Sequence, residues 1–141
     1  MSLEESRRLV RRKIALWYEP DRLDELRSLV TDDYVHHAPQ GDLSFAAFAE
    51  QLGYLATTFT EPKVEVLHVV VEDDLAAAFI AYEATHSGPF GGVEPTGCRV
   101  STTGAYHCRI AAGAVAEDWD AWGLLGILRQ VEAAARAGGA A

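Results

Sequence analysis

The first part of the chain carries apolar residues every three or four positions, a period typical of amphipathic helices. One helix is predicted over residues 3–18, and Pro20 ends it because proline disfavours a helical conformation in the residue before it. A shorter helix is predicted over residues 21–30. A third follows Ser44, a good N-cap for the apolar stripe from Phe45 to Leu55. The intervening residues 32–39 are interpreted as a loop.

From residue 63 the apolar period changes to two, which favours β-strands. Strands are predicted over residues 63–71, 75–86, 99–110 and 115–122, separated by turns that favour antiparallel neighbours. A terminal helix or turn starts at Leu124 and leads into an alanine-rich tail that we expect to fray from about residue 136. Helices first and strands afterwards predict the α+β class. We expect the N-terminal helices to pack in a strongly curved mixed or antiparallel sheet.

Composition narrows the classes of function. A chain of 141 residues is the size of one domain, here 1–141, and its net charge of -9 argues against nucleic acid as a partner. No apolar run reaches the ~18 residues of a membrane span, and the N-terminus lacks the build of a secretory signal. We therefore expect a cytoplasmic protein with no membrane partner. Neither nucleotide-binding glycine motifs nor paired CxxC cysteines occur, so no cofactor and no metal are expected.

The last predicted hairpin carries the strongest candidates for chemistry. If its turn centres on Ala112 and Gly113, His107 lies across from Asp118 and diagonal to Asp120. An imidazole and an acid beside an apolar concavity form a plausible proton-transfer pair. Strand alternation alone leaves open that both acids lie on a solvated face.

Two other sets of histidines stand near predicted element ends. His36 and His37 lie in the predicted loop, where one of them is a candidate for facing a pocket. His86 ends a strand and precedes a glycine- and proline-rich segment, which we interpret as a shaped loop at the rim of a pocket.

Five segments, in this order, resemble the SnoaL-like polyketide cyclases within the wider nuclear-transport-factor-2-like superfamily. They are Asp32-Asp33-Tyr34-Val35-His36-His37-Ala38-Pro39, Thr85-His86-Ser87-Gly88-Pro89-Phe90, Pro95-Thr96-Gly97-Cys98-Arg99-Val100, Tyr106 through Ile110, and Glu117-Asp118-Trp119-Asp120-Ala121-Trp122-Gly123-Leu124-Leu125. The resemblance covers nearly the whole chain. It implies a conical α+β barrel with a largely apolar pocket and a homodimer formed through the sheet face.

The resemblance also assigns expected roles. Asp120 looks like the aspartate that serves as general acid and base in a cofactor-independent intramolecular aldol condensation, the ring closure of a polyketide-like substrate, and His107 looks like its polar companion. The residues expected to bind the substrate are His37, His86, Tyr34, Phe90, Trp122 and Trp17. Such a role belongs to secondary metabolism.

Three alternatives stay open because one fold hosts many functions. A ketosteroid-isomerase-like enzyme would use Asp120 as base and a tyrosine as oxyanion donor. An epoxide hydrolase would need an Asp-Arg-Asp arrangement, for which Arg109 is the candidate on the face of His107. A non-catalytic module would bind a small apolar ligand without chemistry.

Overall fold

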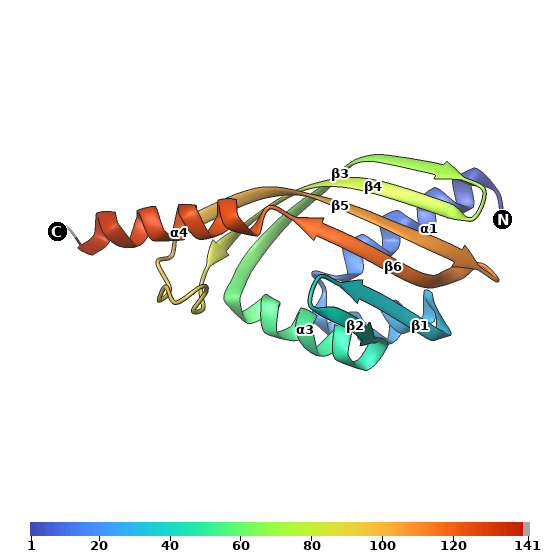
Figure 1. Ribbon diagram of the computed structural model, residues 1–141, viewed down its shortest axis with the longest axis horizontal. Helices are drawn as coiled ribbons and strands as arrows, with labels where there is room; N and C mark the ends of the chain where they lie inside the picture. Colours follow the sequence, from blue (N-terminus) through green and yellow to red (C-terminus); the bar gives the residue numbers. More distant parts are fainter. Residues whose placement is uncertain (140–141) are drawn as a thin grey trace.

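The computed structural model describes residues 1–139, which form four α-helices and six β-strands (Figure 1). The helices are α1 (Leu3–Leu16), α2 (Leu23–Ser28), α3 (Phe45–Thr58) and α4 (Leu124–Gly139), with a 3₁₀ turn, η1 (Pro20–Arg22), before α2. The strands are β1 (Val30–Ala38), β2 (Gly41–Ser44), β3 (Phe59–Glu72), β4 (Leu75–His86), β5 (Arg99–Ala111) and β6 (Ala114–Trp122). Within these residues, no helix combines the length and the apolar character needed to cross a membrane.

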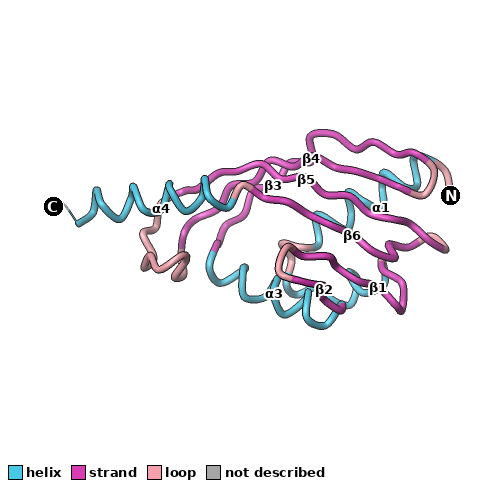
Figure 2. The backbone as a smooth tube through the Cα atoms, in the orientation of Figure 1, coloured by secondary structure: helices cyan, strands magenta, loops and turns pink. Residues whose placement is uncertain are grey.

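The strands form one mixed sheet in the order β2-β1-β6-β5-β4-β3. All neighbours are antiparallel except β1 and β6, which are parallel. The sheet curves over α1, and α3 lies below it and touches both edge strands, β2 and β3 (Figures 1 and 2). The sheet is curled but not closed, and this cone-like α+β fold confirms the predicted class.

Sequence periodicity missed β1 and β2, where we expected a loop. In β1 the buried side chains include Tyr34 and His36, whereas Val35 and His37 are only partly buried. The alternation is present, but polar residues occupy the inner positions, so a search for apolar residues does not detect it. The predicted second helix is also shorter than expected, because Val30 already belongs to β1.

The strand expected to begin at Lys63 begins at Phe59 instead. Pro62 lies inside β3, where the pairing with β4 is interrupted between Thr60 and Lys63. Glu61 has a positive φ of 51° at the same place. Because β3 is an edge strand and the ladder is broken there, proline is tolerated within it.

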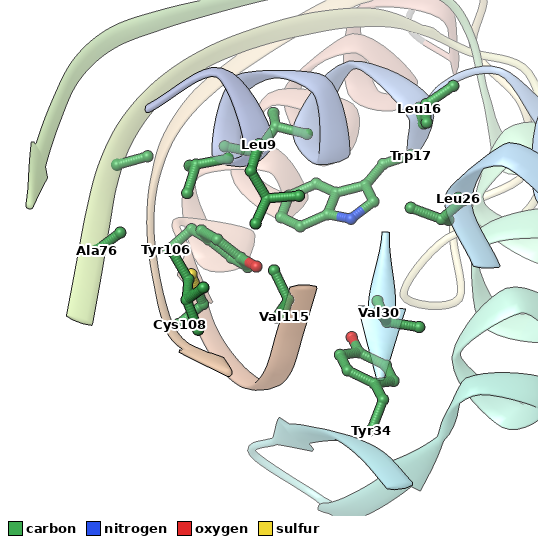
Figure 3. Close-up of a cluster of buried hydrophobic side chains, with 14 of the residues drawn as sticks. Leu9, Leu16, Trp17, Leu26, Val30, Tyr34, Ala76, Tyr106, Cys108 and Val115 are labelled. Atoms are coloured by element: carbon green, nitrogen blue, oxygen red, sulfur yellow. The ribbon is translucent and has the colours of Figure 1, made fainter. Parts of the chain in front are cut away.

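The main core lies between α1, α3 and the inner face of the sheet. Its buried side chains come from distant parts of the chain, among them Leu9, Trp17, Leu26, Tyr106 and Val115 (Figure 3). A second, smaller core contains Phe59, Ala84, Val100, Ile127 and Val131, and joins the start of α4 to the ends of β3, β4 and β5.

Helix α4 continues the sheet beyond the end of β6 and then projects from the body (Figure 1). The amide side chain of Gln130 accepts from the backbone N–H of Ser101 at 2.9 Å and donates to its carbonyl oxygen at 2.8 Å. These are the bonds that a further residue of β6 would make with β5. The helix runs to Gly139, and residues 140–141 of the tail expected to fray lie outside the described residues.

Candidate active site

An extra residue in the β5–β6 hairpin decides which side chains face the interior. Ile110 pairs with Val115, as the expected turn requires, but Arg109 pairs with Glu117, so Ala116 forms a β-bulge. A shift of one residue moves all later side chains of a strand to the opposite face relative to their partners.

The prediction that His107 lies beside the two aspartates is therefore wrong. Beyond the bulge, His107 pairs with Trp119 and Tyr106 pairs with Asp120. Asp118 and Asp120 do share the inner face, as alternation predicted. His107 is exposed on the outer face, where its ring stacks on Trp119 with centroids 4.6 Å apart.

The carboxylate of Asp118 is fully buried and has four hydrogen-bond donors. Oδ1 accepts from the Tyr34 hydroxyl at 2.8 Å and from His36 Nδ1 at 2.7 Å. Oδ2 accepts from the Tyr106 hydroxyl at 2.8 Å and pairs with Lys13 Nζ at 2.7 Å. Figure 3 shows the hydroxyl groups of Tyr34 and Tyr106 pointing into the same region of the interior.

Lys13 is as buried as its partner. Its ammonium group lies 5.0–5.4 Å from the ring centroids of Trp17, Tyr34, Phe48 and Tyr106. Such contacts stabilise a desolvated cation. Lys13 lies four residues before Trp17 on the apolar stripe of α1, and this spacing is the signal in the sequence for its burial.

The buried charges fix the protonation of the cluster. Burial raises the pKa of Asp118, but Lys13 and His36 outweigh this effect and hold it at about 2. Burial lowers the pKa of His36, but hydrogen bonds to Asp118 and Asp120 raise it to about 9. Burial also lowers the pKa of Lys13, and Asp118 opposes that change. At neutral pH the interior holds an aspartate anion and an imidazolium side by side.

Exposure along β6 rises from the closed end of the interior toward α4. The side chain of Asp118 is 0% exposed, that of Asp120 is 18% exposed, and Trp122 is also partly exposed. The facing stripe of α3 shows the same trend, since Phe48 is buried whereas Leu55 is 39% exposed. Asp120 therefore lies where the closed interior begins to open.

The carboxylate of Asp120 is held by two side chains, one on each of its oxygens. Oδ2 accepts from the indole Nε1 of Trp122 at 3.2 Å, and Oδ1 lies 3.6 Å from Nε2 of His36. The Trp122 ring lies against Gly104, where a Cβ atom would come within 2.4 Å of it. Glycine at position 104 is thus required for the indole to reach Asp120.

Aromatic rings extend from Asp120 toward the open end. Tyr18 stacks on Tyr82 with centroids 5.3 Å apart, and Tyr82 meets Trp122 edge to face at 6.0 Å. All three side chains are partly exposed. They form an aromatic surface suited to a flat, apolar ligand.

His37 lies on the outer face. Its Nδ1 is 2.7 Å from Asp42 and its Nε2 is 2.9 Å from Glu117. Glu117 also accepts from Arg109 Nε at 2.7 Å. Because Arg109 belongs to this outer cluster, it does not form the Asp-Arg-Asp arrangement of an epoxide hydrolase with Asp118 and Asp120.

His86 lies at neither a rim nor a mouth but is fully buried in the second core. Its Nδ1 accepts from the backbone N–H of Thr96 at 3.2 Å. Phe90, in the segment that follows, packs on Phe59 with ring centroids 5.1 Å apart. Of the residues expected to bind substrate, Trp122, Trp17 and Tyr34 lie on the interior side, and His37 does not.

The arrangement combines an accessible carboxylate with a fixed internal cation, which suits proton transfer. The sequence placed Asp118 and Asp120 on one face and made one of His36 and His37 a candidate for facing a pocket; of the two, His36 points inward. Lys13 and Tyr106 were not predicted. Among residues 1–139, no three His, Cys, Asp or Glu side chains gather in a way that would hold a metal ion.

Comparison with known proteins places this arrangement in a family. Residues 7–131 match the SnoaL-like polyketide cyclase family. AclR of Streptomyces galilaeus, described as a candidate hydroxylase, is 30% identical over 93% of this chain and 98% of its own, with a TM-score of 0.83.

Two further solved structures are similar. IdmH of Streptomyces antibioticus, a candidate polyketide cyclase, is 26% identical over 85% of this chain and 96% of its own, with a TM-score of 0.74. TsrD of Streptomyces laurentii is 24% identical over 93% of this chain and 97% of its own, with a TM-score of 0.81. A comparison with functionally curated proteins found no match. The chain belongs to the SnoaL-like polyketide cyclase family.

Proposed function

We propose that the protein is a cofactor-independent cyclase that closes a ring in a polyketide-like carbonyl substrate by intramolecular aldol condensation. Asp120 serves as the general base and then as the general acid. The observation that carries this proposal is the position of Asp120, a carboxylate that is partly exposed at the open end of the interior and touches a buried cationic network.

The reaction begins when Asp120 removes a proton from a carbon that lies between two carbonyl groups. The electron pair of the broken C–H bond moves to a carbonyl oxygen and forms an enolate. The enolate carbon then attacks a further carbonyl of the same molecule, one that does not flank it, and Asp120 returns its proton to the new alkoxide. A carbon acid activated by two carbonyls needs only a weak base, and holding both reacting carbons in one site favours ring closure.

The buried network supports this step electrostatically. Lys13 and Asp118 offset each other, and His36 offsets the ionised Asp120, so the cluster is formally neutral before reaction. When Asp120 takes the proton, one positive charge is left over. That charge stabilises the negative enolate in a site where water is scarce. His36 acts as a positioning residue, since Asp118 fixes its ring and its Nε2 faces Asp120.

The test compares Asp120→Asn with Glu117→Gln. Both variants replace an acid by an amide on β6, but Glu117 lies on the outer face and so provides the matched control. The substrate is an aryl β-ketoester that carries a 2-oxopropyl group ortho to its ketone, so that a third carbonyl is available for closure of a six-membered ring. We expect Asp120→Asn to lower the rate of ring closure by roughly 10²-fold or more, as loss of a general base does. Glu117→Gln should stay within about twofold of the parent, and chromatography of the cyclised product measures both. If Asp120→Asn forms the cyclised product at the rate of the parent, Asp120 is not the general base.

The same site supports proton-transfer isomerisation as a second candidate. Asp120 would move a proton from the α- to the γ-carbon of a β,γ-unsaturated ketone. Conjugation of the product, followed by ultraviolet absorbance, distinguishes this activity from ring closure. Tight ligand binding with neither product would instead identify a non-catalytic binding module.

We also propose that two copies associate through the outer sheet face. This face exposes Leu67, Val70, Leu75 and Phe79, and carries a hollow of about 440 Å³ near Phe79. Strands β3 to β6 span roughly 19 Å by roughly 40 Å at standard spacings. The resulting area of about 750 Å² is close to the ~800 Å² per partner of a standard interface.

Charge favours a second copy as the occupant. Three cations, Lys63, Arg99 and Arg109, lie on this face among four glutamates, so the face repels a copy of itself far less than the net charge of -9 suggests. Sedimentation should give a dimer for the parent and a monomer for Phe79→Glu. A parent protein that stays monomeric at micromolar concentration would contradict the association.

A further inference from the structure

Among the residues that the structure describes, the indole N–H of Trp17 is a buried donor without an acceptor. The residue is 5% exposed, and among the described residues its Nε1 has no hydrogen-bond partner. Buried polar groups are almost always paired, so an unpaired donor in a cluster of charged and hydroxylic groups calls for an explanation. Phenylalanine would fill much of the same space without leaving this donor unsatisfied.

The spacing of residues along α1 and β6 brings Trp17 to the level of Asp120. Both elements run in the same direction (Figure 1), and Lys13 pairs with Asp118. Four residues along a helix and two residues along a strand both advance about 6 Å. Trp17 therefore stands at the level of Asp120, just as Lys13 stands at the level of Asp118.

Ring contacts agree with this placement. The indole of Trp17 packs edge-on against Tyr106 with centroids 5.1 Å apart, and Tyr106 is the cross-strand partner of Asp120. Figure 3 shows the indole nitrogen on the side of the ring toward which the Tyr34 hydroxyl points.

Four other donors around the two acids are engaged. The hydroxyls of Tyr34 and Tyr106 and Nδ1 of His36 all bond to Asp118. Trp122 Nε1 donates to Asp120. The second buried nitrogen without a partner, Nε2 of His86, belongs to the core beneath α4 and not to this cluster.

We infer that Trp17 Nε1–H donates a hydrogen bond to the ligand carbonyl oxygen that becomes the enolate oxygen. This inference rests on the proposed role of Asp120 as the base. As the C–H bond breaks, its proton goes to Asp120 and its electron pair moves to the oxygen bonded by Trp17, which keeps its own proton. A neutral donor of this kind stabilises an enolate without protonating it, and it selects ligands with an unhindered carbonyl oxygen.

The first test is Trp17→Phe, with Trp119→Phe on the outer face as the matched control. We expect Trp17→Phe to lower kcat by roughly 10²- to 10³-fold, the usual effect of losing one oxyanion donor. KM should change only a few-fold, and Trp119→Phe should leave both values within about twofold. Trp17→Phe with the kcat of the parent would overturn the inference.

The second test needs neither turnover nor a stable variant. Protein labelled with ¹⁵N at its three tryptophans is titrated with 2-naphthol, a planar phenol whose oxygen resembles that of an enol. We expect the indole N–H resonance of Trp17 to move downfield while that of Trp119 stays in place. A Trp17 resonance that does not move on saturation would overturn the inference.

The two tests also separate this inference from the proposed function. If Asp120→Asn keeps full activity while the Trp17 resonance still moves, the base is misassigned and the hydrogen bond to the ligand stands. If Asp120→Asn is inactive and Trp17→Phe is fully active, the base stands and the donor assignment fails.

Discussion

Removing Lys13 should expose the cost of the buried charges. In Lys13→Met, the thioether side chain keeps most of the volume of the lysine stem, but the ammonium group that lies 2.7 Å from Asp118 is lost. Breaking a buried ion pair from one side costs about 3–5 kcal/mol, because a charge is left without its partner. Here His36 still faces the carboxylate, so we expect a loss of about 3 kcal/mol.

The double variant Lys13→Met/Asp118→Asn tests the cause of that loss. An amide at position 118 can still bond to Tyr34, His36 and Tyr106 and carries no charge. We expect the double variant to be more stable than Lys13→Met by about 2 kcal/mol, since no unpaired anion is left behind. A loss caused by poor packing of methionine would instead persist in the double variant.

Urea unfolding followed by tryptophan fluorescence measures these free energies. Lys63→Met serves as the control, because the side chain of Lys63 is 78% exposed and its removal should change stability by less than about 0.5 kcal/mol. Two results would refute the reasoning. One is a loss of less than about 1 kcal/mol in Lys13→Met, and the other is a double variant no more stable than the single one.

Three further outcomes follow from the same contacts. The pKa of His36 is raised from 6.5 to about 9, so the contribution of its charged form to the free energy of unfolding should be complete below pH 6.5. That contribution, at most about 3 kcal/mol, should be lost as the pH rises through 9. Urea unfolding from pH 5 to pH 10 should show this loss in the parent and not in His36→Asn. Gly104→Ala should lower stability by about 1–3 kcal/mol and change the near-ultraviolet circular dichroism, because a methyl group there collides with Trp122. Gly53→Ala is the control, since its methyl group meets open space in helix α3 and should stabilise the protein by about 0.5–1 kcal/mol. Gln130→Ala should lower stability by about 1 kcal/mol and speed hydrogen exchange at the amide of Ser101; an unchanged exchange rate would count against the bond between α4 and β5.

The sequence predicted the bounds of an element correctly where those bounds depend on residues of the element itself. Ser44 caps α3 through a bond from the N–H of Ala47, as its position indicated. The strand predicted over residues 75–86 agrees with β4 at both ends. Side-chain capping fixes the start of α3, and turn residues with period-two alternation fix β4, in both cases without reference to the rest of the chain.

Long-range features escaped prediction for physical reasons. The bulge at Ala116 arises from how β6 pairs with β5 and β1, and no property of an alanine marks it in the sequence. β1 went unrecognised because its inner positions hold Tyr34 and His36, which are buried only because Asp118 and Lys13 meet them there. The resemblance pointed to Asp120 and Trp122, which do contact each other, but not to Lys13 or Tyr106, whose positions depend on long-range packing.

The bulge at Ala116 also bears on how this hairpin can change over evolution. Deleting that one residue would turn the later part of β6 over, moving the two aspartates to the outer face and bringing Glu117 and Trp119 inward. A change in chain length would thus replace the whole set of interior groups in one step, which no single substitution can do. Relatives whose hairpin is one residue shorter are therefore expected to carry their reactive groups at the positions of β6 that correspond to Glu117 and Trp119 here. An alignment of such hairpins should match inward-facing with inward-facing positions before it matches residue types.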